Sequence, residues 1–196
     1  MITAAITSLL LAATTASANS STIELQAIAG CISAGPIKGV ETKRSIPATA
    51  RSITVPGGAE LQVSVLDGYR VLMATAQGQL FVNLKLERSA PGKAEADRDA
   101  IRRQMQGFVS QAPAGSPPLK REQGGGVETL GLDQPSLDGG GPLGFYTLFL
   151  PHADMVVTAY LLNQPAAQRD FATYADYERL RDQALAQVKA CLPKAD

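Results

Sequence analysis

Residues 80–87 read LFVNLKLE, and this short stretch decides the fold class that the sequence predicts. Its apolar side chains at every second position are Leu80, Val82, Leu84 and Leu86. The positions between them hold Phe81, Asn83, Lys85 and Glu87. Because successive side chains of a strand point to opposite faces of its sheet, this alternation predicts a strand with one face on a core and the other in water. A strand of this kind is typical of antiparallel sheets.

Two more strand-like segments precede this one. Residues 61–66 and 69–76 are mainly apolar, and Asp67-Gly68 separates them. An Asp-Gly pair between two such segments is a strong signal for a tight hairpin turn. We therefore expect three consecutive strands that form an antiparallel meander. A further short strand is expected around residues 51–55.

Three helices are expected around these strands. Over residues 94–111 apolar side chains recur at helical spacing, at Ile101, Met105, Phe108 and Val109. The last helix should begin after Thr173, whose hydroxyl can cap it together with Asp176 three residues later. A similar capping pair starts the first helix, which we expect over residues 22–33.

A second group of strands is expected at residues 127–132, 145–150 and 155–162. The last two are almost continuously apolar, which is typical of central strands with both faces covered. The segments 112–126 and 134–144 are rich in Gly and Pro and are predicted to be surface loops. The order lacks a regular strand–helix alternation, so the predicted fold class is α+β. We expect an antiparallel sheet of about five to seven strands packed against two or three helices.

The chain has two cysteines, Cys31 and Cys191, which fall in the first and last predicted helices. They are too far apart in sequence for a C-x-x-C redox pair, so we predict a structural disulfide that joins the two ends of the domain. Such a bond closes a loop of about 160 residues and contributes roughly 5 kcal/mol by the chain-entropy relation. Cys191 continues the apolar stripe of the last helix, and we expect it to be buried.

Residues 1–18 read MITAAITSLLLAATTASA and are predicted to be a signal peptide. An apolar stretch is followed by small polar residues and by Ala16-Ser17-Ala18, a typical cleavage signal. We expect cleavage after Ala18, export to the periplasm or the extracellular space, and a single α+β domain over residues 19–196. Two alternatives stay open: a buried N-terminal helix, or a lipoprotein anchored through Cys31, whose preceding residues resemble a lipobox.

The predicted order of elements resembles that of the PsbP-like family. The resemblance rests on Tyr69-Arg70-Val71-Leu72, on Phe145-Tyr146-Thr147-Leu148 and on the helix after Thr173, and it covers residues 59–192. It implies an α/β/α sandwich, with a middle helix and a closing helix docked on a hairpin-rich sheet. It also implies an accessory or binding subunit rather than an enzyme. The first helix, joined to the last, is a departure from this pattern.

Composition disfavours several classes of function. Lys plus Arg equals Asp plus Glu, 18 of each, so the chain has no basic excess for binding nucleic acid. It has no Trp and only five Tyr and five Phe, which removes the usual stacking platform for sugars and bases. We expect no cofactor, no metal, and no transmembrane segment in the mature chain. Lys43, Arg44 and Arg51 form at most a weak patch for anions.

His152 is the chain's one histidine. With Asp154 two residues later in a predicted turn, it is a candidate general base oriented by a carboxylate. No G-x-S-x-G nucleophile motif accompanies it, and an ordinary polar turn is the simpler interpretation. Gly139, Gly141 and Gly144 fit a dinucleotide-binding spacing. A strand rather than a helix is predicted after them, so we expect a loop.

Two functional hypotheses follow from the sequence. The first is an exported, non-enzymatic accessory or binding protein, whose partner is an envelope protein or a small apolar ligand. The wall of such a ligand site would come from Val71, Met73, Phe81, Phe145 and Phe149, but the same side chains are equally well explained as core, and we favour that interpretation. The second is a periplasmic hydrolase that uses His152 as its general base.

Overall fold

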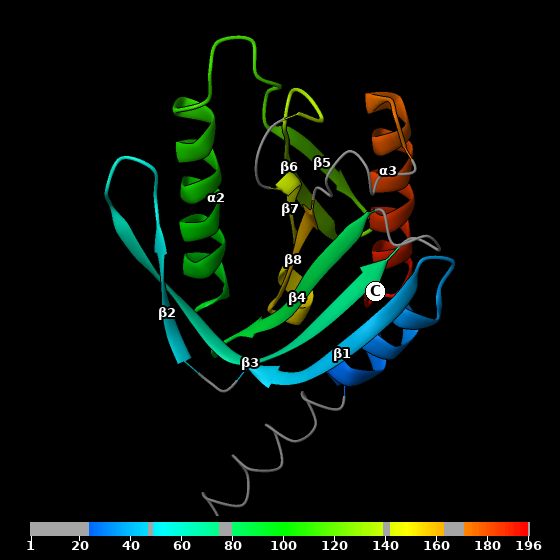
Figure 1. Ribbon diagram of the computed structural model, residues 1–196. Coiled ribbons are helices and arrows are strands. Elements are labelled where there is room, and N and C mark those ends of the chain that lie inside the picture. The colour runs from blue at the N-terminus through cyan, green and yellow to red at the C-terminus, as the bar shows by residue number, and fades with distance from the viewer. Residues whose placement is uncertain (1–23, 47–48, 75–79, 139–141, 163–170, 196) are drawn as a thin grey trace, which may run out of the picture.

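The computed structural model describes residues 24–46, 49–74, 80–138, 142–162 and 171–195 (Figure 1). The strands in these residues are β1 (Lys38–Ile46), β2 (Thr49–Thr54), β3 (Glu60–Ala74), β4 (Phe81–Ser89), β5 (Lys120–Gly124), β6 (Val127–Asp133), β7 (Pro142–Leu150) and β8 (Met155–Leu162). Helices α2 (Ala94–Ser110) and α3 (Tyr174–Ala190) follow β4 and β8, and the 3-10 turn η1 (Pro151–Ala153) joins β7 to β8. The N-terminal helix is described over residues 24–34.

These eight strands form one antiparallel sheet in the order β1-β3-β4-β8-β7-β6-β5. The sheet is only seven strands wide, because β1 and β2 both pair with the same edge of β3 and therefore count as one position in this order. The prediction of an α+β fold with an antiparallel sheet, packing helices and joined ends is confirmed. β7 and β8 are the central, almost fully buried strands that their apolar sequences predicted.

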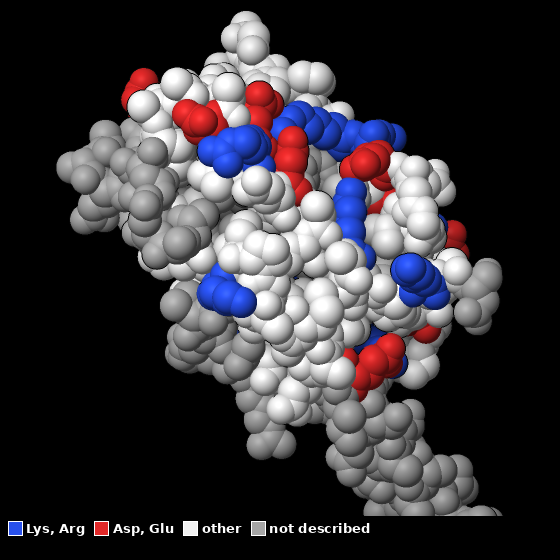
Figure 2. Space-filling view, turned by 90° about the vertical axis from the view of Figure 1, so that its right-hand side faces the viewer, with Lys and Arg blue, Asp and Glu red and all other residues white. Residues whose placement is uncertain are grey.

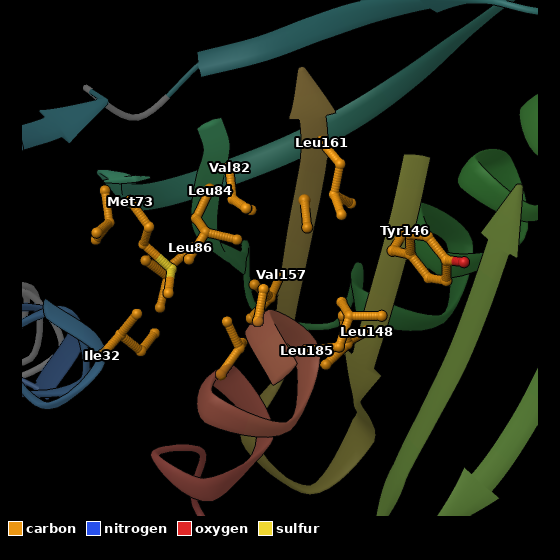
Figure 3. Close-up of a cluster of buried hydrophobic side chains, with 14 of the residues drawn as sticks. Ile32, Met73, Val82, Leu84, Leu86, Tyr146, Leu148, Val157, Leu161 and Leu185 are labelled. Carbon is orange, nitrogen blue, oxygen red and sulfur yellow. The ribbon is translucent and has the colours of Figure 1, made fainter. Parts of the chain in front are cut away.

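Helices cover both faces of the sheet (Figure 1). On one face lie α3 and the N-terminal helix, and Figure 3 shows their side chains, such as Ile32 and Leu185, meeting Leu84, Leu148 and Val157 of the sheet. On the other face α2 packs Ile101 and Met105 against a second, smaller core. The result is a three-layer α/β/α arrangement. Membership of the PsbP-like family stays a prediction.

The hairpin predicted at Asp67-Gly68 is wrong, because β3 runs without a break from Glu60 to Ala74. Gly68 pairs with Glu87 of β4 on one side and with Ile46 of β1 on the other. A register shift between Val65 and Asp67 marks a bulge at this point. The Asp-Gly pair therefore lies at a bend in β3, where the neighbouring strand changes from β2 to β1.

The segment 112–126, predicted to be a loop, contains β5. Gly125 and Gly126 both have positive φ, 58° and 77°, and they form the two-residue connection from β5 to β6. Two central residues with positive φ are what the favoured tight hairpin turn requires, which explains the glycines. The predicted loop at 134–144 is shorter than expected because β7 already begins at Pro142. Gly139 and Gly141 lie outside the described residues.

The predicted signal peptide, residues 1–18, also lies outside the described residues. Among the helices that the structure describes, none combines the length and apolar character that a membrane crossing needs. Figure 2 shows the side of the molecule on which α3 lies, where acidic and basic side chains stand next to one another. Lys189 of α3 forms an ion pair with Glu122 of β5 at 2.6 Å.

Candidate functional site

The predicted disulfide is present and joins Cys31 to Cys191, with 5.8 Å between their Cα atoms. It ties the N-terminal helix to the residue that ends α3. Cys191 is half-buried and packs against the core, whereas Cys31 is exposed, so the bond is only partly buried. The side chain of Gln187, one turn before Cys191, strengthens the junction with hydrogen bonds to the backbone of Ile32 and Ile37.

His152 and Asp154 lie at the turn between β7 and β8, and both are exposed. The His152 ring nitrogen Nε2 is 3.2 Å from the carbonyl oxygen of Pro193, and Asp154 ends η1 in the left-handed conformation. A hollow of about 400 Å³ lies beside the ring. The described residues that line it include Arg98 and Arg102 but no Ser, Thr or Cys, so this part of the chain brings no hydroxyl or thiol nucleophile to His152.

A buried carboxylate connects strands of the sheet to helix α3. Asp133, the last residue of β6, accepts hydrogen bonds from the hydroxyls of Tyr146 at 2.6 Å and Tyr177 at 2.7 Å. Arg181 of α3 and Lys120 of β5 pair with the same carboxylate at 2.7 and 2.8 Å. Burial, reinforced by this carboxylate, raises the pKa of both tyrosines, so they stay neutral donors. With all its partners present, Asp133 holds elements together and is not available to a ligand.

An apolar surface lies on the α2 face, between α2 and strands β4, β7 and β8. A hollow of about 470 Å³ there adjoins a second one of about 250 Å³. We call the two together the aromatic groove, and define it by Arg51, Lys85, Gln104, Phe108, Phe145 and Tyr160. Strand alternation places Phe145 and Tyr160 on this face, opposite the side that packs on α3.

Three aromatic rings form the floor and one wall of the groove. Phe145 and Tyr160 stack with 5.0 Å between ring centroids and 8° between ring planes. Phe108 of α2 meets Phe145 edge-on, with 6.2 Å between their centroids. Phe108 is 44% exposed, and no other large apolar side chain of the described residues is exposed. Phe108 is therefore not part of the core, although it belongs to the predicted apolar stripe of α2. Ile101 and Met105 of the same stripe are buried, as predicted.

Positive charge lies at the other end of the groove. Lys85 places its Nζ 5.4 Å from the centroid of the Tyr160 ring, a cation–π distance. Arg51 reaches from β2 to form a 2.6 Å ion pair with Glu87. Glu87 is 4% exposed, and its second oxygen has no hydrogen-bond partner within the described residues. The face of β4 that was predicted to be wet is thus partly covered, by Arg51 and by α2.

Burial shifts the pKa of both titratable groups of β4 in this region. Loss of water, and then the charge of Arg51, lower the pKa of Lys85. Burial raises the pKa of Glu87 even though Arg51 and Lys85 oppose the shift. Glu87 is buried and Lys85 is half-buried, and charges shielded from water in this way interact more strongly than at an open surface.

The structure supports the core interpretation for three of the five side chains named as a possible ligand wall. Val71 and Met73 are fully buried on the face that packs against α3, and Phe149 is 1% exposed in the core beneath α2. Phe81 is half-buried and does not line the groove, whereas Phe145 does. The sequence predicts Lys85 on the water-facing side of its strand and Phe108 in the apolar stripe of its helix. Neither pattern connects these two residues with a ligand site.

Within the described residues, no group of three or more His, Cys, Asp or Glu side chains could hold a metal ion. Comparison with known protein families, with curated proteins and with solved structures found no match to this chain. A function therefore has to be derived from the geometry of the aromatic groove.

Proposed function

We propose that this chain is an exported binding protein whose aromatic groove takes a small organic ligand with an apolar, ring-containing body. The observation that carries the proposal is Phe108, an exposed aromatic side chain edge-on to the stacked pair of Phe145 and Tyr160. An aromatic ring inserted beside Phe108 would complete a cluster that the protein leaves open on one side. Aromatic contacts of this kind contribute about 0.5–1.5 kcal/mol each beyond the area that they bury.

The dimensions and lining of the groove support a small ligand. Small-molecule sites are commonly clefts of about 300–1,000 Å³ with mainly apolar walls and a few polar groups that fix orientation. The larger hollow measures about 470 Å³ and combines Ile53, Ile101 and Phe145 with the polar side chains of Gln104 and Thr158. A body of one to three fused rings matches this space.

The exported location is part of the proposal. The disulfide between Cys31 and Cys191 is compatible with an oxidising, extracellular environment. The sequence of residues 1–18 supports a cleaved leader. Expression of the full chain in a bacterial host, followed by N-terminal sequencing of the extracytoplasmic product, should give Asn19 as the first residue. An intact Met1 would contradict export by this route.

The hydrolase alternative has less support, since no described hydroxyl or thiol lines the hollow beside His152. His152→Ala discriminates between the two functions. The binding proposal expects ligand affinity to be unchanged, because His152 does not line the aromatic groove. Hydrolysis of a chromogenic ester that disappears in this variant, with stability retained, would favour the enzyme.

Binding is tested with anthracene-2-carboxamide, a neutral fluorescent probe, by fluorescence anisotropy. The chain has no Trp, so protein emission does not interfere. Saturable binding of one probe per chain is expected, and Phe108→Ala should weaken it by about tenfold, which corresponds to roughly 1.4 kcal/mol. Phe108 is exposed, so its truncation should leave the core intact.

The matched control is Val109→Ala, an apolar truncation at the next position of α2 that does not line the groove. It should bind the probe as the wild type does. Absence of saturable binding to the wild type, both of this neutral probe and of its carboxylate counterpart, would overturn the proposed function, and so would equal loss in both variants.

A further inference from the structure

We propose that the aromatic groove selects organic anions, with Lys85 and Arg51 receiving a carboxylate group carried by the ring body of the ligand. This inference rests on the proposed function and adds the charge of the ligand to it. The chemical class is an amphipathic aromatic carboxylate, whose ring lies on Phe108, Phe145 and Tyr160 while its acidic end points toward β4 and β2.

The first support is the sign of the charge around the larger hollow. Its described lining contains two cationic side chains, Lys85 and Arg51, and no acidic one, while Asp133, which lines the smaller hollow, has a fully buried side chain. The whole chain is neutral, so this local excess is not a consequence of composition. Elsewhere, on the side where α3 lies, charges of both signs are interspersed (Figure 2).

The second support is a like-charge pair in the sheet. Arg70 of β3 lies directly opposite Lys85 of β4 in the antiparallel register. Like charges opposite one another on neighbouring strands destabilise a sheet. Among the side chains that the structure describes, Glu87, two residues along β4, is an acidic group close to this pair, and Arg51 engages one of its oxygens. Three cations, Arg51, Arg70 and Lys85, thus act on a single carboxylate. A bound anion would relieve this imbalance.

The third support is the position of the cations relative to the rings. Nζ of Lys85 stands 5.4 Å from the Tyr160 ring, and the same ring stacks on Phe145. A ligand that lies on Phe145 therefore has its far end near Lys85. Partial burial of Lys85 strengthens its attraction for an anion, because fewer water molecules compete for the charge. Gln104 and Thr158 line the same hollow and supply polar groups between the two ends.

The test compares two probes of the same shape and different charge, anthracene-2-carboxylate and anthracene-2-carboxamide, by fluorescence anisotropy at pH 7. The wild type should bind the carboxylate at least about tenfold more tightly than the amide. The difference should shrink as salt is raised from about 0.01 to 0.5 M, because ions screen the attraction.

Lys85→Gln is the informative variant, since Arg51 also neutralises the buried Glu87 and its loss endangers the fold. Lys85→Gln should weaken carboxylate binding by about tenfold and leave amide binding within twofold of wild type. Lys93→Gln removes the same charge from an exposed position just before α2 and should change neither affinity.

Each outcome decides one of the two claims. Equal affinities for the carboxylate and the amide in the wild type would overturn the selection of anions and leave the proposed function standing. Equal losses in Lys85→Gln and Lys93→Gln would also overturn it, because the effect would then be one of net charge. Failure of both probes to bind would overturn both claims.

Discussion

Arg51 and Glu87 form a 2.6 Å ion pair between β2 and β4, at the inner end of the aromatic groove. The pair fixes the guanidinium of Arg51 in place, but it satisfies only one oxygen of a carboxylate that is 4% exposed. Burial therefore dominates, and the pKa of Glu87 is raised from its ordinary value of 4.5.

This shift predicts a specific dependence of stability on pH. Because the folded pKa is raised, the folded chain holds the Glu87 proton more tightly than the unfolded chain does. Its contribution to stability is complete below the unfolded pKa of 4.5 and is lost as the pH rises through the folded pKa. A glutamine side chain cannot ionise, so Glu87→Gln does not lose this contribution. The unfolding free energy of the variant should therefore increase relative to that of the wild type as the pH is raised from about 4 to 7.

Urea unfolding followed by circular dichroism at several pH values measures this difference. Glu95→Gln is the control, because its side chain is 85% exposed, and its profile should run parallel to that of the wild type. A Glu87→Gln profile that also runs parallel would contradict the assignment.

The buried pair of Arg181 and Asp133 gives a second prediction. Arg181→Ala leaves the Asp133 carboxylate without its closest cation, in a place where the side chain of Asp133 is fully buried. Removal of one partner from a buried pair typically costs about 3–5 kcal/mol, so a loss of that size is expected in urea unfolding. Arg179→Ala, which breaks an exposed pair with Asp176 on the same helix, should cost less than about 1 kcal/mol. Similar losses in the two variants would show that the Asp133 cluster is not a centre of stability.

Gly144 gives a third prediction, because it owes its place to the same cluster. A Cβ at this position would overlap the hydroxyl of Tyr177 and stand 2.9 Å from an oxygen of Asp133. Gly144→Ala should therefore lower the unfolding free energy by about 1–3 kcal/mol, as overpacking does in other cores. Gly124→Ala is the matched strand control, since nothing lies within 4 Å of its Cβ, and it should be neutral or slightly stabilising. An unchanged melting temperature for Gly144→Ala would mean that Tyr177 does not need this space.

The disulfide gives a fourth prediction. Cys31 and Cys191 are 160 residues apart, so their bond should contribute roughly 5 kcal/mol, an upper value from the chain-entropy relation. The double variant Cys31→Ala, Cys191→Ala should lose a large part of this in urea unfolding. A reducing agent should destabilise the wild type and leave the double variant unaffected. Native protein whose two thiols react with iodoacetamide before any reduction would contradict the bond.

Elements specified by local pattern could be predicted from the sequence. Thr173 accepts a hydrogen bond from the backbone N–H of Asp176, as the capping pair predicted. The apolar runs of β7 and β8 occupy the centre of the sheet, because only central strands are covered on both faces. The disulfide was predictable too, since the chain has only two cysteines, which lie too far apart in sequence for a redox-active pair.

Features that depend on distant pairing could not be predicted. Asp67-Gly68 has the composition of a hairpin turn, yet β1 and β2 supply neighbours that keep β3 extended through it. The aromatic groove is a second case, because its residues come from β2, β4, α2, β7 and β8 and no local spacing joins them. Phe108 is exposed although it shares the apolar spacing of Ile101 and Met105, and helical periodicity alone does not tell how much of such a stripe the sheet covers.

The most direct test of the anion-binding groove is to map where anthracene-2-carboxylate binds, by ¹H–¹⁵N correlation NMR on the disulfide-bonded chain. Titration should shift the amide signals of Lys85, Phe108, Phe145 and Tyr160 most strongly, and leave those of the turn at His152 unmoved. Shifts centred on His152, or spread evenly over the sheet, would contradict a binding site in the groove.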